Sequence, residues 1–242
     1  MTAHIVVHPS PEVLAASAAA RLITFLADLQ AEGRTPAVAL TGGGVGTQTL
    51  AQVASSPARD AVDWGQVEIY WGDERFVPRD DPERNELQAR QALLDRIAID
   101  PARVHPMAPS DGEFGGDPDA AAAAYQEALR PLDLVLLGMG PEGHVASVFP
   151  DSPAVHDDRA VVAVRNCPKP PPTRVSLTLP TIRAADQVWL LVAGAAKADA
   201  VASAVGGANE VDLPAAGATG VARTLWLLDT EAASALPRDP RG

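Results

Sequence analysis

The sequence predicts an α/β fold in which a mainly parallel sheet is flanked by helices on both faces. Short apolar segments alternate with segments of helical spacing along most of the 242 residues. The core must consist of aliphatic side chains, because 47% of the residues are hydrophobic and only 4% are aromatic. Buried parallel strands have this composition. Two apolar segments also run directly into glycine-rich loops, as strands do beside a ligand site in such a sheet.

The chain is predicted to open with a strand and a long helix. Residues 5–8 are short and β-branched, which favours a strand. Ser10, Pro11 and Glu12 then supply an N-cap, a first helical residue and an acidic first turn. The helix is expected to end near Glu32, because a glycine follows.

A strand, a glycine loop and a helix come next. Residues 37–41 are predicted to form a buried strand, and a helix is predicted over residues 47–54. Between them, the backbone N–H groups of Gly42, Gly43 and Gly44 could bind a phosphate or a sugar hydroxyl, because a helix N-terminus favours an anion. The loop has neither the lysine of a Walker loop nor the spacing of a dinucleotide fingerprint. A tight turn without a ligand is the alternative.

The next predicted strand, residues 67–71, is followed by a charged run. This run consists of Asp73, Glu74 and Arg75. The forked guanidinium of Arg75 could face an anionic substrate at the strand end, with a neighbouring carboxylate to orient it. An exposed charged loop is the alternative. Residues 83–97 have helical spacing.

The second glycine loop carries the candidate catalytic residue. A helix is predicted over residues 117–129, and residues 134–137 form a wholly apolar strand that breaks into the loop of residues 138–144. His144 ends this loop, and its ordinary pKa suits it to move protons near neutrality. His144 is therefore a candidate general base, with a capping or surface histidine as the alternative.

The rest of the chain is predicted to add a helix over residues 195–205. Further strands are predicted at residues 160–164, 175–179, 188–192 and 224–228. Strands that alternate with helices are joined by right-handed crossovers and form a mainly parallel sheet. Arg174 precedes a strand and Lys197 begins the helix, so both cations could lie at the sheet edge that carries Arg75. Ordinary surface charge is the alternative for each.

Length, charge and cysteine content restrict the function. We expect one domain over residues 1–242, with a frayed end at residues 232–242. The formal net charge of −12 opposes binding to nucleic acid or to an anionic membrane. The single Cys167 cannot form an intramolecular disulfide, and no cysteine cluster indicates a metal site. Residues 1–7 lack the pattern of a signal peptide, so we expect a cytoplasmic protein.

Two longer motifs resemble the 6-phosphogluconolactonase family. Residues 137–150 read LGMGPEGHVASVFP, which looks like the family's signature around its catalytic histidine. Residues 71–78 read WGDERFVP, a second specific match. Three residues beyond it also match: Asp81, Pro82 and Asn85. The resemblance spans residues 37–197 and implies a Rossmann-like fold shared with sugar-phosphate isomerases.

The resemblance implies proton transfer by His144, with Glu142 beside it, and phosphate binding by Arg75. The other substrate contacts that it implies come from Gly42, Gly43, Gly44, Asp73, Gly143, Arg174 and Lys197. Two positions depart from the family pattern. Members commonly have Asp where this chain has Glu142, so the role of this carboxylate depends on one extra methylene being accommodated. Gly44 stands where members have Ser or Thr, so only backbone contacts are expected there.

The activity that the resemblance implies is hydrolysis of the ring ester of a phosphosugar lactone, 6-phosphogluconolactone. We expect a monomer that uses no metal and no cofactor. The glucosamine-6-phosphate deaminase family is the first alternative, but it continues after its histidine toward Asn-Glu-Pro, whereas this chain reads SVFP at residues 147–150. A non-catalytic sugar-phosphate binding protein would not need His144. A dinucleotide-dependent oxidoreductase would need the fingerprint that residues 42–46 lack.

Overall fold

The central sheet has six strands in the order β1-β9-β8-β5-β2-β3, and every neighbouring pair is parallel. The computed structural model describes residues 3–237. The six strands are β1 (His4–His8), β2 (Ala37–Leu40), β3 (Glu68–Trp71), β5 (Leu134–Leu137), β8 (Gln187–Val192) and β9 (Arg223–Asp229). The predicted mainly parallel sheet is therefore confirmed.

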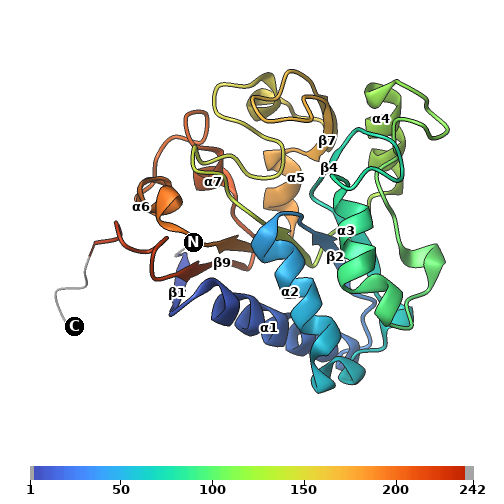
Figure 1. The fold of residues 1–242 in the computed structure, drawn as a ribbon, viewed down its shortest axis with the longest axis horizontal. Coiled ribbons are helices and arrows are strands. Elements are labelled where there is room, and N and C mark those ends of the chain that lie inside the picture. The colour runs from blue at the N-terminus through green and yellow to red at the C-terminus, as the bar shows by residue number, and fades with distance from the viewer. Residues whose placement is uncertain (1–2, 238–242) are drawn as a thin grey trace.

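Helices cover both faces of this sheet (Figure 1). One face carries α1 (Pro11–Ala31), α2 (Gly44–Ser55) and α3 (Asn85–Ala92). The other face carries α4 (Pro118–Ala128), α5 (Leu179–Ala184), α6 (Ala198–Val205) and α7 (Pro214–Gly217). Successive strand residues point to opposite faces, so Leu134 and Leu136 join the first core while Val135 and Leu137 join the second. This is why the strands are apolar without alternation.

A second sheet of three antiparallel strands lies apart from the first, in the order β4-β7-β6. Its strands are β4 (Asp73–Arg75), β6 (Val161–Val164) and β7 (Arg174–Leu177). The sequence predicts the last two strands in the mainly parallel sheet and predicts no strand in the charged run, and both predictions are wrong. β4 has no hydrophobic pattern in its sequence, because polar contacts, rather than apolar packing, hold its buried carboxylates.

Smaller differences concern the ends of elements. α2 begins at Gly44, three residues earlier than predicted, because Gly43 serves as its N-cap with a φ of 81° that glycine readily adopts. The helix predicted over residues 83–97 ends at Ala92 and continues as a short 3-10 turn. Of the tail predicted to fray, Ala232 is fully buried, and residues 238–242 lie outside the described residues.

The two glycine loops meet where the strand order reverses. From β2 the chain moves outward to β3, whereas from β5 it moves the opposite way to β8. The adjacent strands β2 and β5 therefore form a switch point, where α/β sheets bind ligands beyond the carboxyl ends of their strands. The Gly138 N–H donates to Oγ1 of Thr41 at 3.1 Å, which ties the two loops together. Among residues 3–237, no helix combines the length and apolarity that crossing a bilayer requires.

Candidate active site

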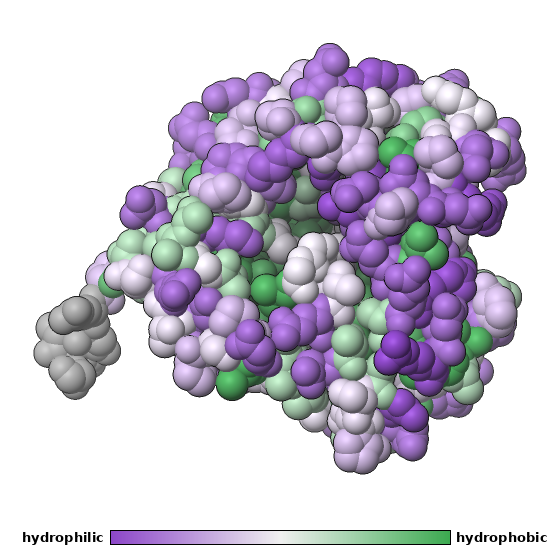
Figure 2. Space-filling model, in the orientation of Figure 1, coloured by the Kyte–Doolittle hydropathy of each residue, from purple (hydrophilic) through white to green (hydrophobic). Residues whose placement is uncertain are grey.

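A cavity of about 340 Å³ opens at this switch point. Figure 2 shows this face of the molecule hollowed near its centre, with hydrophilic residues along much of the rim. The cavity is lined by most of the predicted site residues: Gly42, Gly43, Gly44, Asp73, Arg75, His144, Arg174 and Lys197. The predicted convergence of the cations is thus seen, whereas Glu142 and Gly143 are not among the lining residues.

His144 reaches the cavity from the loop after β5, and its side chain is 15% exposed. Its ring stacks on Phe149 with 4.4 Å between the ring centroids. Burial lowers the pKa of His144 below its ordinary value, and the nearby carboxylate of Glu142 only partly offsets this effect. The imidazole is therefore neutral near pH 7, which is the form that accepts a proton.

Glu142 stands beside the catalytic candidate, as predicted, and its extra methylene is accommodated. Its Oε1 lies 3.0 Å from Nδ1 of His144, although Nδ1 has no hydrogen-bond partner of good geometry among the described residues. The same carboxylate accepts a hydrogen bond from Nζ of Lys169 at 3.0 Å. Burial tends to raise the pKa of Glu142, but its own backbone N–H, Lys169 and His144 outweigh burial and hold that pKa below its ordinary value.

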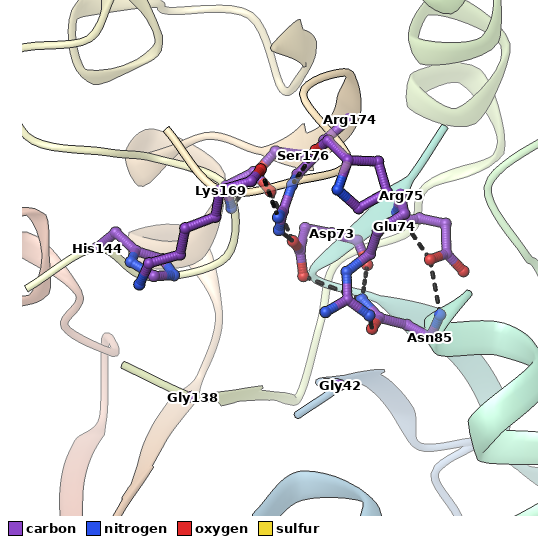
Figure 3. Close-up of polar contacts among 12 residues, drawn as sticks. Gly42, Asp73, Glu74, Arg75, Asn85, Gly138, His144, Lys169, Arg174 and Ser176 are labelled. Atoms are coloured by element: carbon purple, nitrogen blue, oxygen red, sulfur yellow. Dashed lines mark hydrogen bonds and ion pairs between the residues drawn. The ribbon is translucent and has the colours of Figure 1, made fainter. Parts of the chain in front are cut away.

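Lys169 is a lining residue that the sequence analysis missed. It lies in a proline-rich stretch, residues 168–172, where no motif or periodicity marks a functional side chain. In Figure 3 its side chain extends across the site toward His144. Its positive charge also contributes to lowering the pKa of His144, after burial and against the effect of Glu142.

Replacing Lys169 by Gln is expected to raise the pKa of His144, because a neighbouring positive charge disfavours the imidazolium. NMR titration of the His144 ring measures this shift directly. In the pH profile of kcat/KM, the acid limb should move to higher pH, because the base must be neutral to work. Lys169→Arg keeps the charge and should leave the titration near that of the wild type. An unchanged His144 titration in the Gln variant would contradict this electrostatic role.

Arg174 holds the segment that carries Lys169. It is 5% exposed, and its guanidinium donates from Nε to the carbonyl of Pro171 (3.2 Å) and from Nη2 to that of Lys169 (3.3 Å). Its Nη1 lies 3.8 Å from Oδ2 of Asp73, and its Cζ lies 5.9 Å from the centre of the Phe149 ring. Most of its donors are therefore engaged within the protein, and the predicted phosphate contact of Arg174 stays a prediction.

Asp73, in β4 of the second sheet, bonds to the loop that follows β5 of the central sheet. Its Oδ2 accepts a hydrogen bond from Oγ of Ser147 at 2.6 Å, and Ser147 is fully buried. Asp73 itself is 7% exposed. Because Ser147 lies just after His144, this bond fixes the loop of His144 against β4.

Arg75 is anchored at one corner of its guanidinium (Figure 3). Its Nη1 donates to the carbonyl of Glu83 at 2.6 Å and to Oδ1 of Asn85 at 2.5 Å. Its Nε is buried and has no hydrogen-bond partner within the part of the chain that the structure describes. The guanidinium is therefore only partly hydrogen-bonded within the protein, and the residue lines the cavity.

Glu74 caps the start of α3, for which the N-cap residue supplies no side-chain bond. Its carboxylate accepts the backbone N–H groups of Arg75 and Asn85 at one oxygen (2.8 and 2.7 Å) and that of Glu86 at the other (2.8 Å). Because Glu74 is only 2% exposed, burial raises its pKa to about 7 despite these bonds and the nearby cation of Arg84.

The raised pKa of Glu74 makes stability depend on pH. Between pH 4.5, the ordinary pKa, and about 7, the native state keeps a proton that the unfolded chain has released. The stabilisation is thus present at low pH and lost as the pH rises through about 7. We expect the unfolding free energy of the wild type, relative to Glu74→Gln, to fall by up to about 3 kcal/mol across this range. Denaturant melts at several pH values measure it, and a constant difference would contradict the assignment.

The remaining predicted residues differ in what they contribute. Burial, and then the charge of Lys169, lowers the pKa of Lys197 at the cavity wall. A Cβ at Gly44 would meet no atom within 4 Å, so this glycine leaves the wall open. Gly143 has a φ of 86°, and a Cβ there would lie 2.4 Å from Cδ1 of Leu213. Backbone conformation and packing against Leu213, which is not a lining residue of the cavity, therefore require glycine at this position. Its predicted substrate contact stays a prediction.

Comparisons with known proteins place the chain in a family. The family model described as glucosamine-6-phosphate isomerases/6-phosphogluconolactonase matches residues 9–226. The chain is 55% identical to 6-phosphogluconolactonase of Streptomyces coelicolor, over 98% of this chain and 96% of the relative. It is 49% identical to that of Mycobacterium tuberculosis, over 98% and 100%. A solved structure of 6-phosphogluconolactonase from Trypanosoma brucei superposes with a TM-score of 0.80 at 27% identity, over 98% of this chain and 99% of that one. The chain therefore belongs to the glucosamine-6-phosphate isomerase/6-phosphogluconolactonase family.

Proposed function

We propose that the chain hydrolyses 6-phosphogluconolactone to 6-phosphogluconate. One observation carries the proposal: the half-buried His144 and the cations Arg75, Lys169 and Lys197 line the same cavity of about 340 Å³. A neutral His144 supplies the base that ester hydrolysis needs, and the cations supply a place for a phosphate. The 6-phosphogluconolactonases that are 49% and 55% identical over nearly the whole chain support the same reaction.

In the proposed reaction, His144 takes a proton from water while that water attacks the lactone carbonyl. The tetrahedral oxyanion is stabilised by donors from the glycine loops at the ends of β2 and β5. The imidazolium then gives its proton to the departing ring oxygen, which opens the ring and restores the neutral base. Glu142, 3.0 Å from Nδ1, stabilises the imidazolium while it exists.

Arg75 is proposed to bind the 6-phosphate and so to place the carbonyl carbon against the water, which converts remote binding energy into orientation. Lys169 and Lys197 are proposed to share the charge of the phosphate. Arg174 is assigned to hold the segment of Lys169. We also propose that the enzyme acts as a cytoplasmic monomer of one domain in the pentose phosphate pathway, and that the reaction needs no metal and no cofactor.

A deaminase reaction is disfavoured by how the loop after His144 is used. Residues 147–150, SVFP, contain no carboxylate to assist ring opening, and Ser147 and Phe149 are instead engaged with Asp73 and with the ring of His144. The glycine loop disfavours the alternative of a dinucleotide-dependent oxidoreductase. Its third glycine, Gly44, is already the first residue of α2, so the loop lacks the spacing of the dinucleotide fingerprint.

The test is hydrolysis of freshly generated 6-phosphogluconolactone, followed by NADP reduction through added 6-phosphogluconate dehydrogenase. Product formation well above the spontaneous rate would support the proposal. A parallel assay measures ammonia release from glucosamine 6-phosphate. Release of ammonia without lactone hydrolysis would replace the lactonase by the deaminase, and inactivity in both assays would favour a binding protein.

A further inference from the structure

Asn85, the first residue of α3, contacts several parts of the site at once (Figure 3). Its Nδ2 donates to the backbone oxygen of Asp73 at 2.8 Å and to Oδ1 of the same residue at 3.3 Å. Its Oδ1 accepts a hydrogen bond from Nη1 of Arg75 at 2.5 Å. The residue is only 3% exposed. Both polar atoms of the amide therefore have partners within the protein.

The bond to Asn85 determines which nitrogen of the Arg75 guanidinium is left for a ligand. Nη1 carries two hydrogens, and both are used, one by Asn85 and one by the carbonyl of Glu83. The Nε is buried without a partner among residues 3–237, while Arg75 lines the cavity. Charged N–H donors form strong hydrogen bonds to phosphate oxygens. Because Nη1 is anchored and Nε is shut off from solvent, Nη2 is the guanidinium nitrogen left for that purpose.

The position of Asn85 is itself fixed from two sides. Its backbone N–H donates to the buried carboxylate of Glu74 at 2.7 Å, which holds the start of α3 against β4. On the other side lies Gly42, where a Cβ would come within 1.9 Å of Oδ1 and 2.5 Å of Cγ of Asn85. Any side chain at Gly42 would displace the amide.

We propose that Asn85 is a positioning residue that sets the Arg75 guanidinium, so that its Nη2 faces the phosphate, and that Gly42 is glycine because the Asn85 amide fills the space of a Cβ. The inference rests on the anion-binding role of Arg75 in the proposed function. It reassigns Gly42, which the sequence analysis took for a backbone ligand of the substrate.

The first test compares Asn85→Ala with the wild type. The KM for 6-phosphogluconolactone should rise about tenfold or more, because a charged hydrogen bond that orients the anion-binding group is lost, while kcat should change little. The Kd for 6-phosphogluconate, measured by calorimetry, should rise by the same factor. Gln91→Ala, at an exposed position of α3, is the matched control and should match the wild type.

A double-mutant cycle separates positioning from a merely structural effect. If Asn85 acts through Arg75, the double variant should bind 6-phosphogluconate no more weakly than Arg75→Ala alone. Gly42→Ala, with Asn85 intact, should reproduce the KM defect by pushing the amide away. Circular dichroism and a thermal melt establish whether Asn85→Ala folds. If it does not fold, Gly42→Ala replaces it in the test.

Two results would overturn the inference: defects that multiply in the double variant, or a loss in kcat with an unchanged KM. A wild type that does not hydrolyse the lactone would sink the proposed function alone, since binding of 6-phosphogluconate and inorganic phosphate needs no turnover and still tests Asn85. A wild type that binds neither anion would overturn the anion-binding role of Arg75 and, with it, the role of Asn85.

Discussion

His144→Ala is expected to lower kcat for 6-phosphogluconolactone by about 10²- to 10⁴-fold, the usual contribution of a positioned general base. KM should change little, because the cations that are proposed to hold the phosphate are untouched. The residual rate should lose the limb of the pH profile that reports the neutral imidazole. The measurement is the coupled assay corrected for spontaneous hydrolysis, since the substrate is an activated ester.

A matched control is His156→Ala, which removes an exposed histidine outside the cavity and should leave kcat and KM unchanged. If His144→Ala keeps the wild-type kcat, lactone hydrolysis remains possible but His144 is not its base. If instead KM rises sharply while kcat is kept, the imidazole binds the substrate rather than moving a proton.

Most of the central sheet could be predicted from local patterns. β5 was predicted at its observed bounds, Leu134–Leu137. A wholly apolar run of four residues that ends at a glycine loop is typical of a buried strand. β4 could not be predicted from such a pattern. Its residues are charged, and its burial depends on partners that lie far along the chain, among them Ser147 and Arg174.

Some residues of the candidate site could likewise be predicted from local motifs, and others could not. His144 and Arg75 lie in contiguous motifs directly after strands, so the sequence was enough to place both at one edge of the sheet. Lys169 was missed because its place depends on a segment that the buried Arg174 holds through backbone carbonyls. Such contacts carry no sequence periodicity. Asn85 was recognised only as part of a motif, since its role depends on hydrogen bonds between the start of α3 and β4 and on the space left by Gly42.

Gly140→Ala should nearly abolish activity without unfolding the protein. A Cβ at this position would lie 2.1 Å from Nδ1 and 2.2 Å from Cε1 of His144, and 2.7 Å from Oε2 of Glu142. The backbone of Gly140 does not need a positive φ, so alanine acts through these contacts and not through strain. The imidazole must move, and a displacement of about 1 Å at a reacting group costs about 10²-fold in rate.

The expected result for Gly140→Ala is therefore a fall in kcat of about 100-fold, with KM and the melting temperature close to those of the wild type. Gly116→Ala is the control, because a Cβ there meets nothing within 4 Å and the residue lies outside the cavity. Since the ring has the open cavity to move into, the protein can relieve the contact at little cost in stability. A Gly140→Ala enzyme with wild-type kcat would show that the observed ring position is not required for proton transfer.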